Sequence, residues 1–160
     1  MEKNCNLDRI DKKILAVVQE DASLSTQEVA DQVGLSLNPC WRRIKRLESD
    51  GIIERRVVLI NPERVGLGTT VFVTIAINRH DMDWLERFST NVCAIPEVVE
   101  CHRLSGSADY LLKVMVRDIA HYDRVYQKLI KAVPGLTDVS STFSMERLKF
   151  STRIDIATAD

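Results

Sequence analysis

The fold of the N-terminal part is decided by residues 25–51, which read STQEVADQVGLSLNPCWRRIKRLESDG. Ser25 and Glu28 match a capping box, in which each side chain accepts a hydrogen bond from the other residue's backbone N–H. Gly34 stands where a helix commonly ends in a left-handed residue. Ser36 is a suitable N-cap for the next helix. Two helices joined by a three-residue turn that contains glycine predict a helix-turn-helix.

Apolar residues recur at helical spacing on both sides of this turn. An earlier helix, with Asn6 as its expected N-cap, has its apolar stripe at Leu7, Ile10, Ile14, Val17 and Val18. The helix after Ser36 is expected to end at Gly51, with a buried stripe at Cys40, Ile44 and Leu47. At about 100° per residue, the opposite side presents Asn38, Arg42, Lys45 and Ser49, flanked by Arg43 and Arg46.

The charge of the chain is unevenly distributed along the sequence. The 160 residues include 22 basic and 23 acidic side chains, for a net charge of −1. Taken alone, this balance argues against a histone-like nucleic-acid binder and against a polybasic membrane anchor. Residues 37–56, however, carry six basic and three acidic side chains, whereas residues 1–36 carry four basic and seven acidic ones. The positive charge therefore coincides with the second helix of the helix-turn-helix and the segment that follows it.

This positive surface has the chemistry of a reader of the DNA major groove. Arginine pairs bidentately with guanine and asparagine with adenine, and flanking cations meet phosphates. A basic run by itself is more often a solvated face, but its place on the second helix favours DNA binding. We expect Arg55 and Arg56 on a wing-like strand over residues 53–60. The predicted DNA contacts are Ser36, Asn38, Arg42, Arg43, Lys45, Arg46, Arg55 and Arg56.

The second half of the chain alternates strand and helix patterns. Strands are predicted over residues 69–77, 98–104, 110–116 and 139–148, and helices over residues 81–92 and 119–133. This βαββαβ order is that of a ferredoxin-like unit. We therefore expect an α+β chain with a winged helix-turn-helix over residues 1–60, a linker over 61–68 and a βαββαβ domain over 69–160.

An enzyme is the main rival interpretation. The sequence contains no P-loop, GxGxxG, HExxH or GxSxG motif. The one dense cluster of metal-ligand types runs from His80 to Asp83, and helix capping by Asp81 or Asp83 explains it better. Spacing alone leaves a serine, cysteine or histidine triad open, although Cys40 lies on a predicted buried stripe. We expect no catalytic residues, no metal and no cofactor. A scaffold that has lost DNA binding is disfavoured by the retained basic helix face.

The cysteines and the apolar runs bear on the compartment. Cys5, Cys40, Cys93 and Cys101 show no CxxC spacing, and the N-terminus lacks the apolar core of a secretory signal. No apolar run approaches the roughly 20 residues that span a bilayer. We expect a cytoplasmic protein with free thiols and no membrane partner. A Cys93–Cys101 bridge stays open as an alternative.

Short motifs in a fixed order run through nearly the whole chain. The N-terminal ones are Leu7-Asp8-Arg9-Ile10-Asp11, Val33-Gly34-Leu35-Ser36, Pro39-Cys40, Arg43-Ile44-Lys45-Arg46-Leu47-Glu48, Gly51-Ile52-Ile53 and Leu59-Ile60-Asn61-Pro62. The C-terminal ones are Glu100-Cys101-His102, Ser105-Gly106, Asp109-Tyr110-Leu111-Leu112, Pro134-Gly135 and Met145-Glu146. In its joint order and spacing of motifs, the sequence resembles the Lrp/AsnC, or feast/famine, family of transcriptional regulators.

The resemblance implies a regulator that binds double-stranded DNA and responds to an amino-acid effector through its oligomerisation or its DNA binding. Family members pair through their sheets as homodimers and assemble further, for example into octamers. Their effector lies between dimers, near the loop that is residues 105–110 here. Ser107 and Ala108 are smaller than the acidic and aromatic residues usual in that loop. The implied effector residues are Gly106, Ser107, Ala108, Asp109, Ile119, Thr142 and Phe143.

Asp109 has two interpretations. Aspartate is common in turns because its carboxylate bonds nearby backbone groups, and Gly106 permits a positive φ in the same loop. A carboxylate also accepts readily from an ammonium group, which is the role that the resemblance suggests. Both interpretations remain open on the sequence alone.

Overall fold

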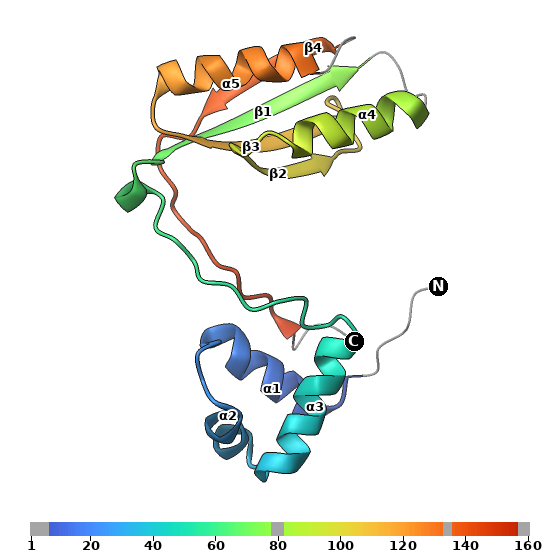
Figure 1. Ribbon diagram of the computed structural model, residues 1–160, viewed down its shortest axis with the longest axis vertical. Helices are drawn as coiled ribbons and strands as arrows, with labels where there is room; N and C mark the ends of the chain where they lie inside the picture. The colour runs from blue at the N-terminus through green and yellow to red at the C-terminus, as the bar shows by residue number, and fades with distance from the viewer. Residues whose placement is uncertain (1–6, 78–81, 133–135, 157–160) are drawn as a thin grey trace. The chain divides into compact units, whose positions relative to one another are not determined.

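The computed structural model describes residues 7–77, 82–132 and 136–156, and these fall into two compact units (Figure 1). The first unit comprises residues 7–59 and the C-terminal residues 149–156. The second comprises the residues from Ile60 to Leu148. Each unit is described separately below.

The first unit is a helix-turn-helix with one preceding helix. Its helices are α1 (Arg9–Glu20), α2 (Thr26–Val33) and α3 (Leu37–Ser49). The capping box of α2 is present: Ser25 Oγ accepts from the Glu28 N–H at 3.3 Å, and Glu28 Oε2 accepts from the Ser25 N–H at 2.7 Å. Gly34 follows with a φ of 75°, a left-handed conformation that disfavours other residues. The predicted turn is confirmed.

The core of this unit lies where the three helices meet. The buried apolar side chains are Ile14, Leu15, Val29, Ala30, Val33, Cys40, Ile44 and Leu47. The predicted stripe of α3 is therefore confirmed, whereas Leu15 of α1 joins the core without having been predicted. Asp8 caps α1 by accepting from the Ile10 and Asp11 N–H groups. Asn6, the expected cap, lies outside the described residues.

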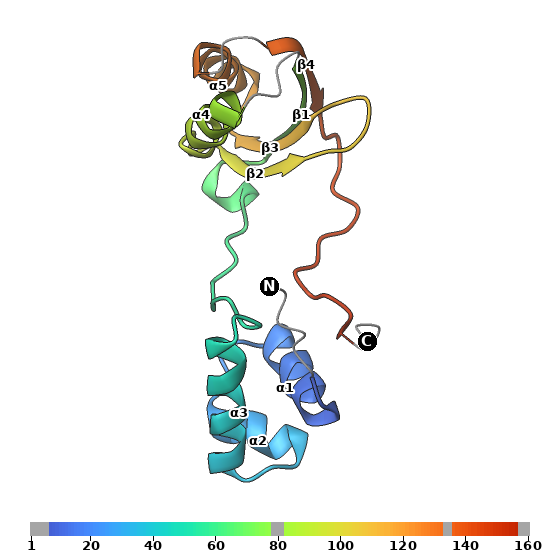
Figure 2. The same ribbon diagram turned by 90° about the vertical axis from the view of Figure 1, so that its right-hand side faces the viewer.

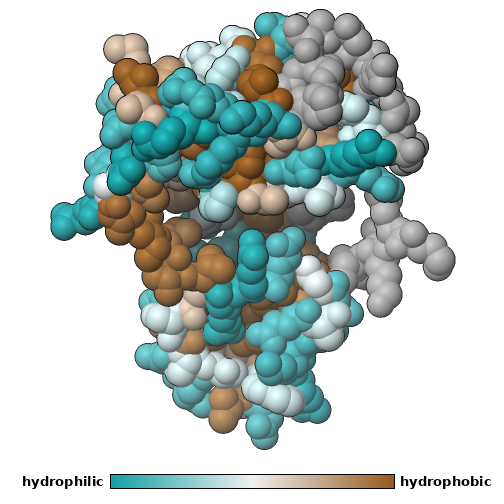
Figure 3. Space-filling view, turned by 45° about the horizontal axis from the view of Figure 1, so that its top comes forward, coloured by the Kyte–Doolittle hydropathy of each residue, from teal (hydrophilic) through white to brown (hydrophobic). Residues whose placement is uncertain are grey.

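The strand expected over residues 53–60 is not formed. Residues 54–60 carry no assigned secondary structure. A strand needs a neighbouring strand to satisfy its backbone groups, and none of the described strands pairs with this segment. Hydrophobic side chains reach the surface in the space-filling view (Figure 3). In this segment the exposed large apolar residues are Val57, Val58, Leu59 and Ile60.

The C-terminal segment belongs to the first unit, not to the domain expected over residues 69–160. The backbone of this segment forms a hydrogen bond with α1, in which the Ile154 N–H donates to Gln19 Oε1 at 2.9 Å. Arg153 forms an ion pair with Glu20 at 3.3 Å, and Ile156 packs against the helical core. These contacts join residues that are far apart in the sequence, so sequence patterns did not predict that the C-terminal segment packs with the first unit.

The second unit is the predicted βαββαβ fold. Its elements are β1 (Thr69–Ile77), α4 (Met82–Cys93), β2 (Val98–Arg103), β3 (Tyr110–Val116), α5 (Ile119–Ala132) and β4 (Leu136–Phe143). The antiparallel sheet has the order β2-β3-β1-β4. The last strand ends five residues before the predicted Leu148. A short 3-10 helix, Glu63–Val65, occupies the segment expected to be a linker.

Both helices of this unit cover the same face of the sheet (Figure 2). Along β3, Tyr110, Leu112, Val114 and Val116 are buried with the helix residues Phe88, Tyr122, Val125 and Leu129. The alternate residues Leu111, Lys113 and Met115 are only half-buried. Because successive side chains of a strand point to opposite faces, these three lie on the face that the helices leave open. No helix among the described residues is long and apolar enough to span a membrane.

Candidate functional site

The side of α3 opposite the core presents the residues assigned to DNA. Asn38, Arg42, Lys45 and Ser49 are all exposed. Neither Asn38 nor Arg42 forms a side-chain hydrogen bond or ion pair with any residue that the structure describes. Arg42 also lines an open hollow together with Pro39, Arg43 and Arg46. The donors of Asn38 and Arg42 are thus available to a partner.

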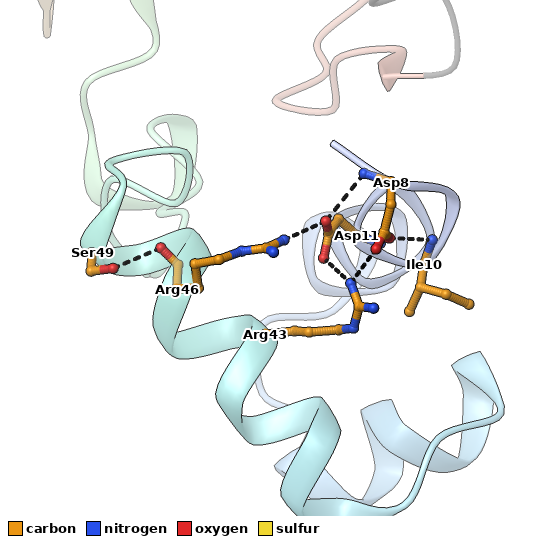
Figure 4. A network of polar contacts seen from close by, with 6 residues as sticks. All are labelled: Asp8, Ile10, Asp11, Arg43, Arg46 and Ser49. Atoms are coloured by element: carbon orange, nitrogen blue, oxygen red, sulfur yellow. Dashed lines mark hydrogen bonds and ion pairs between the residues drawn. The ribbon is translucent and has the colours of Figure 1, made fainter. Parts of the chain in front are cut away.

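Arg43 and Arg46 are engaged within the fold instead (Figure 4). Arg43 Nη1 lies 2.6 Å from Asp8 Oδ2 and 2.8 Å from Asp11 Oδ1. Arg46 Nη2 bonds the other carboxylate oxygen of Asp11. The Asp11 side chain is only 1 % exposed, whereas Arg43 and Arg46 keep 29 % and 48 % of their side chains exposed. The sequence had assigned both arginines to DNA; the structure shows that they also hold α3 against the start of α1.

Asp8 and Arg43 stabilise each other's charged forms. The backbone N–H of Asp11, together with Arg43, lowers the pKa of Asp8 below its ordinary value. The two carboxylates raise the pKa of Arg43 in turn. The Asp8–Arg43 ion pair therefore stays charged at neutral pH and helps to hold α3 against the start of α1.

The remaining basic candidates, Lys45, Arg55 and Arg56, are exposed as well. Lys45 pairs with Glu48 one turn later at 2.7 Å, and Arg56 lies 3.9 Å from the same carboxylate. Arg55 is exposed and bonds no described side chain. Ser36 occupies the N-cap position of α3, but its side chain makes no capping hydrogen bond. Surface ion pairs of this kind are weak, so Lys45 and Arg56 can turn toward a phosphate at low cost.

Asp109 ties the β2–β3 loop to the end of β1. Asp109 Oδ2 accepts from the Ile77 N–H at 2.8 Å, and the Asp109 N–H donates to the Ile75 carbonyl at 2.9 Å. The Leu104 N–H donates to the Asp109 carbonyl at 2.8 Å. The carboxylate thus has a structural role in the turn, and Oδ1 makes none of these contacts. Ser107 is exposed and Ala108 half-buried in the same loop.

Gly106 does not need to be glycine for the sake of the backbone. Its φ is not positive, contrary to expectation. A Cβ added there would meet no atom within 4 Å. Any requirement for glycine at this position would therefore come from a bound partner and not from the loop.

The other implied effector residues lie toward the opposite end of the sheet. On β1, Ile75 pairs with Tyr110, which follows the loop, whereas Val71 pairs with Phe143. These two positions on β1 are four residues apart, which corresponds to about 14 Å. Ile119, at the start of α5, is 71 % exposed and follows the far end of β3. One copy of the chain therefore does not bring the loop and Phe143 to a single small site.

Thr142 and Phe143 also face different sides of the sheet, because they are consecutive in β4. The Phe143 ring packs edge-on against Tyr122 with a centroid distance of 5.3 Å, on the helix-covered side. Thr142, paired with Phe72, lies on the open side. A ligand on either face meets only one of these two side chains.

The candidate metal ligands and the cysteines of the described part of the chain form neither a three-ligand cluster nor a disulfide bridge. No cluster of three histidine, cysteine, aspartate or glutamate side chains occurs within residues 7–77, 82–132 and 136–156. Burial raises the pKa of the Cys40 thiol, so it remains protonated in the core. Cys93 and Cys101 are free, so the alternative of a bridge between them is not realised. The cluster from His80 to Asp83 falls on residues whose side chains lie outside the description, as does Cys5.

Two large apolar side chains on α3 were missed by the sequence analysis. Leu37 and Trp41 are 45 % and 50 % exposed. Both lie on the candidate DNA-binding helix, beside Asn38 and Arg42. The helical projection contained the signal for Trp41, which falls about 60° or more from every residue of the buried stripe, whereas Leu37 falls close to the direction of Ile44.

Comparisons with known proteins agree on one family. Residues 7–54 match a winged helix-turn-helix DNA-binding domain, and residues 70–154 match the Lrp/AsnC ligand-binding domain. The chain is 52 % identical over 146 residues to the glutamate uptake regulatory protein of Zymomonas mobilis, covering 91 % of this chain and 88 % of the relative. It is 47 % identical over 150 residues to the DNA-binding transcriptional activator DecR of Escherichia coli, covering 94 % and 99 %. A solved transcriptional regulator of Neisseria meningitidis in complex with L-methionine is 35 % identical, with a TM-score of 0.88 and coverage of 94 % and 97 %.

Proposed function

The chain belongs to the Lrp/AsnC family of transcriptional regulators, and from this premise we propose how its residues act. It is a DNA-binding regulator and not an enzyme. We propose that α3 enters the major groove, where Asn38 and Arg42 meet base edges. Lys45, Arg55 and Arg56 then contact phosphates. The observation that carries this proposal is the pair of exposed, unengaged side chains Asn38 and Arg42 on the outer side of α3.

We propose that the working form contains several copies of the chain. With Arg43 and Arg46 engaged by aspartates, about three cations per copy are left for phosphates, so one copy alone binds weakly. Two copies present two α3 helices to successive major grooves, which raises the affinity through effective concentration. Half-buried Leu111 and Met115 on the open face of the sheet support pairing of two sheets into a homodimer. Further assembly into an octamer follows the family pattern.

We propose that an amino acid is the effector and that two copies build its site. The loop of residues 106–109 lies about 14 Å along β1 from Phe143, so a small ligand reaches both groups only when a second copy supplies one of them. The loop then provides Asp109 Oδ1 to the ligand's ammonium group. An effector bound between copies stabilises one assembly over another, provided that its affinity for the two assemblies differs. As a regulator of chromosomal genes, the protein would act in the cytoplasm.

The DNA part is tested by a salt titration of binding to a 20-base-pair duplex, followed by fluorescence anisotropy. Six phosphate contacts per dimer predict a slope of log K against log salt of about −5. If Arg43 and Arg46 also met phosphates, ten contacts would give a slope of about −9. Arg42→Ala should lower affinity for a selected site by about 1–3 kcal/mol. Arg87→Ala in the second unit removes the same charge and should change nothing. Equal losses in the two variants would remove Arg42 from base recognition.

The effector part is tested by thermal-shift measurements with the proteinogenic amino acids, since a ligand that binds only the folded form raises the melting temperature. Gly106→Ala fits the loop without strain, so the unliganded protein should melt unchanged. If the ligand approaches the loop closely, this variant loses most of the shift. A full shift in Gly106→Ala would exclude the loop from the site. Light scattering with and without the active amino acid reports the assembly.

A further inference from the structure

The surface of α3 has three chemically distinct strips. At about 100° per residue, Arg43 and Arg46 project to one flank, where they bond the aspartates of α1. The polar centre is made by Asn38, Arg42 and Ser49. The other flank carries Leu37 and Trp41, with Trp41 between Leu37 and Lys45 on the helix circumference. Bases in a groove that holds α3 would therefore meet an apolar flank as well as a polar centre.

The fold itself does not account for Trp41. Its side chain is half exposed and belongs neither to the buried core of the first unit nor to the residues packed against that core. None of the described residues accepts a hydrogen bond from its indole N–H. Alanine has a better helix propensity than tryptophan, so helix formation gives no reason for an aromatic ring at this position. An exposed apolar ring on a helix assigned to DNA favours a contact with the bound partner.

The position of Trp41 identifies that partner. Trp41 precedes Arg42 and lies one turn before Lys45, so the ring is bordered by cations that a polyanion attracts. Within the major groove, the apolar group that distinguishes one base pair from another is the 5-methyl group of thymine. A tryptophan ring supplies a wide, rigid apolar surface for such a contact.

We propose that Trp41 is a specificity-determining residue that reads a thymine 5-methyl group, with Leu37 extending the same apolar contact. This inference rests on the proposed entry of α3 into the major groove and adds a type of readout that Asn38 and Arg42 do not provide. It predicts that the preferred DNA site contains thymine at a fixed position in each half-site. The hydrogen-bonding groups of that base are not required for this contact.

The test replaces thymine by uracil, which lacks only the 5-methyl group. The full-length protein first selects a site from a pool of duplexes with 20 randomised base pairs. Each thymine of the selected duplex is then replaced by uracil in turn, and affinity is measured by anisotropy. One replacement per half-site should weaken wild-type binding about fourfold, the effect of exposing one buried methyl group. Trp41→Ala should bind the thymine duplex more weakly and lose this fourfold preference. Trp41→Phe should retain part of it.

Three comparisons keep the result interpretable. Trp84→Phe removes the other indole, in the second unit, and should keep the full thymine preference. Equal wild-type affinity for every uracil duplex would overturn the proposal, and so would an unchanged preference in Trp41→Ala, which would indicate readout of DNA shape. A changed oligomeric state in Trp41→Ala with an intact thymine preference would assign the ring to a protein contact instead. If the wild type selects no site and binds without salt dependence, the proposed role of α3 itself fails.

Discussion

Replacing Asp11 by asparagine is expected to destabilise the helix-turn-helix while leaving its shape unchanged. Asp11 is the single buried charged side chain among the described residues, and it accepts three hydrogen bonds. One comes from the Asp8 N–H at 3.2 Å, one from Arg43 at 2.8 Å and one from Arg46. Asparagine has the same size, but it has one acceptor oxygen and places an NH2 group where the second oxygen was.

The magnitude follows from these contacts. At least one charge-assisted hydrogen bond is lost, each worth about 1.5–3 kcal/mol. Removing one partner of a fully buried ion pair costs about 3–5 kcal/mol. Here both arginines keep part of their side chains in water, 29 % for Arg43 and 48 % for Arg46, so they can be solvated again. We therefore expect the free energy of unfolding of the first unit to fall by about 2–3 kcal/mol.

The assay is urea unfolding of the full chain in a Trp84→Phe background, in which Trp41 fluorescence reports the first unit. Asp8→Asn is the matched control, because asparagine still caps α1 and only a half-exposed ion pair with Arg43 is lost. That control should cost about 1 kcal/mol or less. If Asp11→Asn were no more destabilising than Asp8→Asn, the network would be an ordinary surface ion pair. The reasoning about a buried anchor for α3 would then be refuted.

Three further results are expected. Asp109→Asn keeps an acceptor for the Ile77 N–H, so it should fold normally yet lose the amino-acid-induced thermal shift if the carboxylate binds an ammonium group; a retained shift leaves Asp109 with its turn role alone. Phe88→Ala, at a ring 4.1 Å from Tyr110, should cost the second unit about 3–5 kcal/mol in thermal or urea unfolding, and a loss below about 1 kcal/mol would contradict its place in the core. Hydrogen bonds lower the folded-state pKa values of Asp8, Glu28 and Glu100. These carboxylates therefore stabilise the folded protein above their unfolded pKa of about 4, and this stabilisation is lost as the pH falls through the lowered folded-state values. A free energy of unfolding that rose on acidification would contradict this prediction.

The candidate DNA-binding surface could be predicted in part. Helical periodicity placed Asn38 and Arg42 outward, because Cys40, Ile44 and Leu47 form one buried stripe. Such a stripe depends only on the spacing of residues three or four positions apart, so the sequence is enough to predict it. The engagement of Arg43 by Asp8 and Asp11 was not predictable in the same way. Residues 32 and 35 positions apart become neighbours only when α1 packs beside α3.

The candidate effector site could also be predicted only in part from the sequence. The resemblance of the sequence to its family indicated both the loop around Asp109 and the end of β4, but it did not indicate their separation. That separation follows from the register of β1 with its two neighbouring strands, which is decided by the assembled sheet. Likewise, the hydrogen bond from Ile77 to Asp109 explains the turn role of the carboxylate only once β1 and the loop are side by side.

The sequence by itself determined the capping box of α2, the left-handed end of α2 at Gly34, the βαββαβ order and the concentration of positive charge on α3, because each of these depends on residues a few positions apart. Tertiary structure decided which arginines remain available, which unit the C-terminal segment joins and whether residues 54–60 form a strand. Each of those outcomes depends on a partner that is distant in the chain, and the free energy of such a contact exists only after the partner has been brought into place.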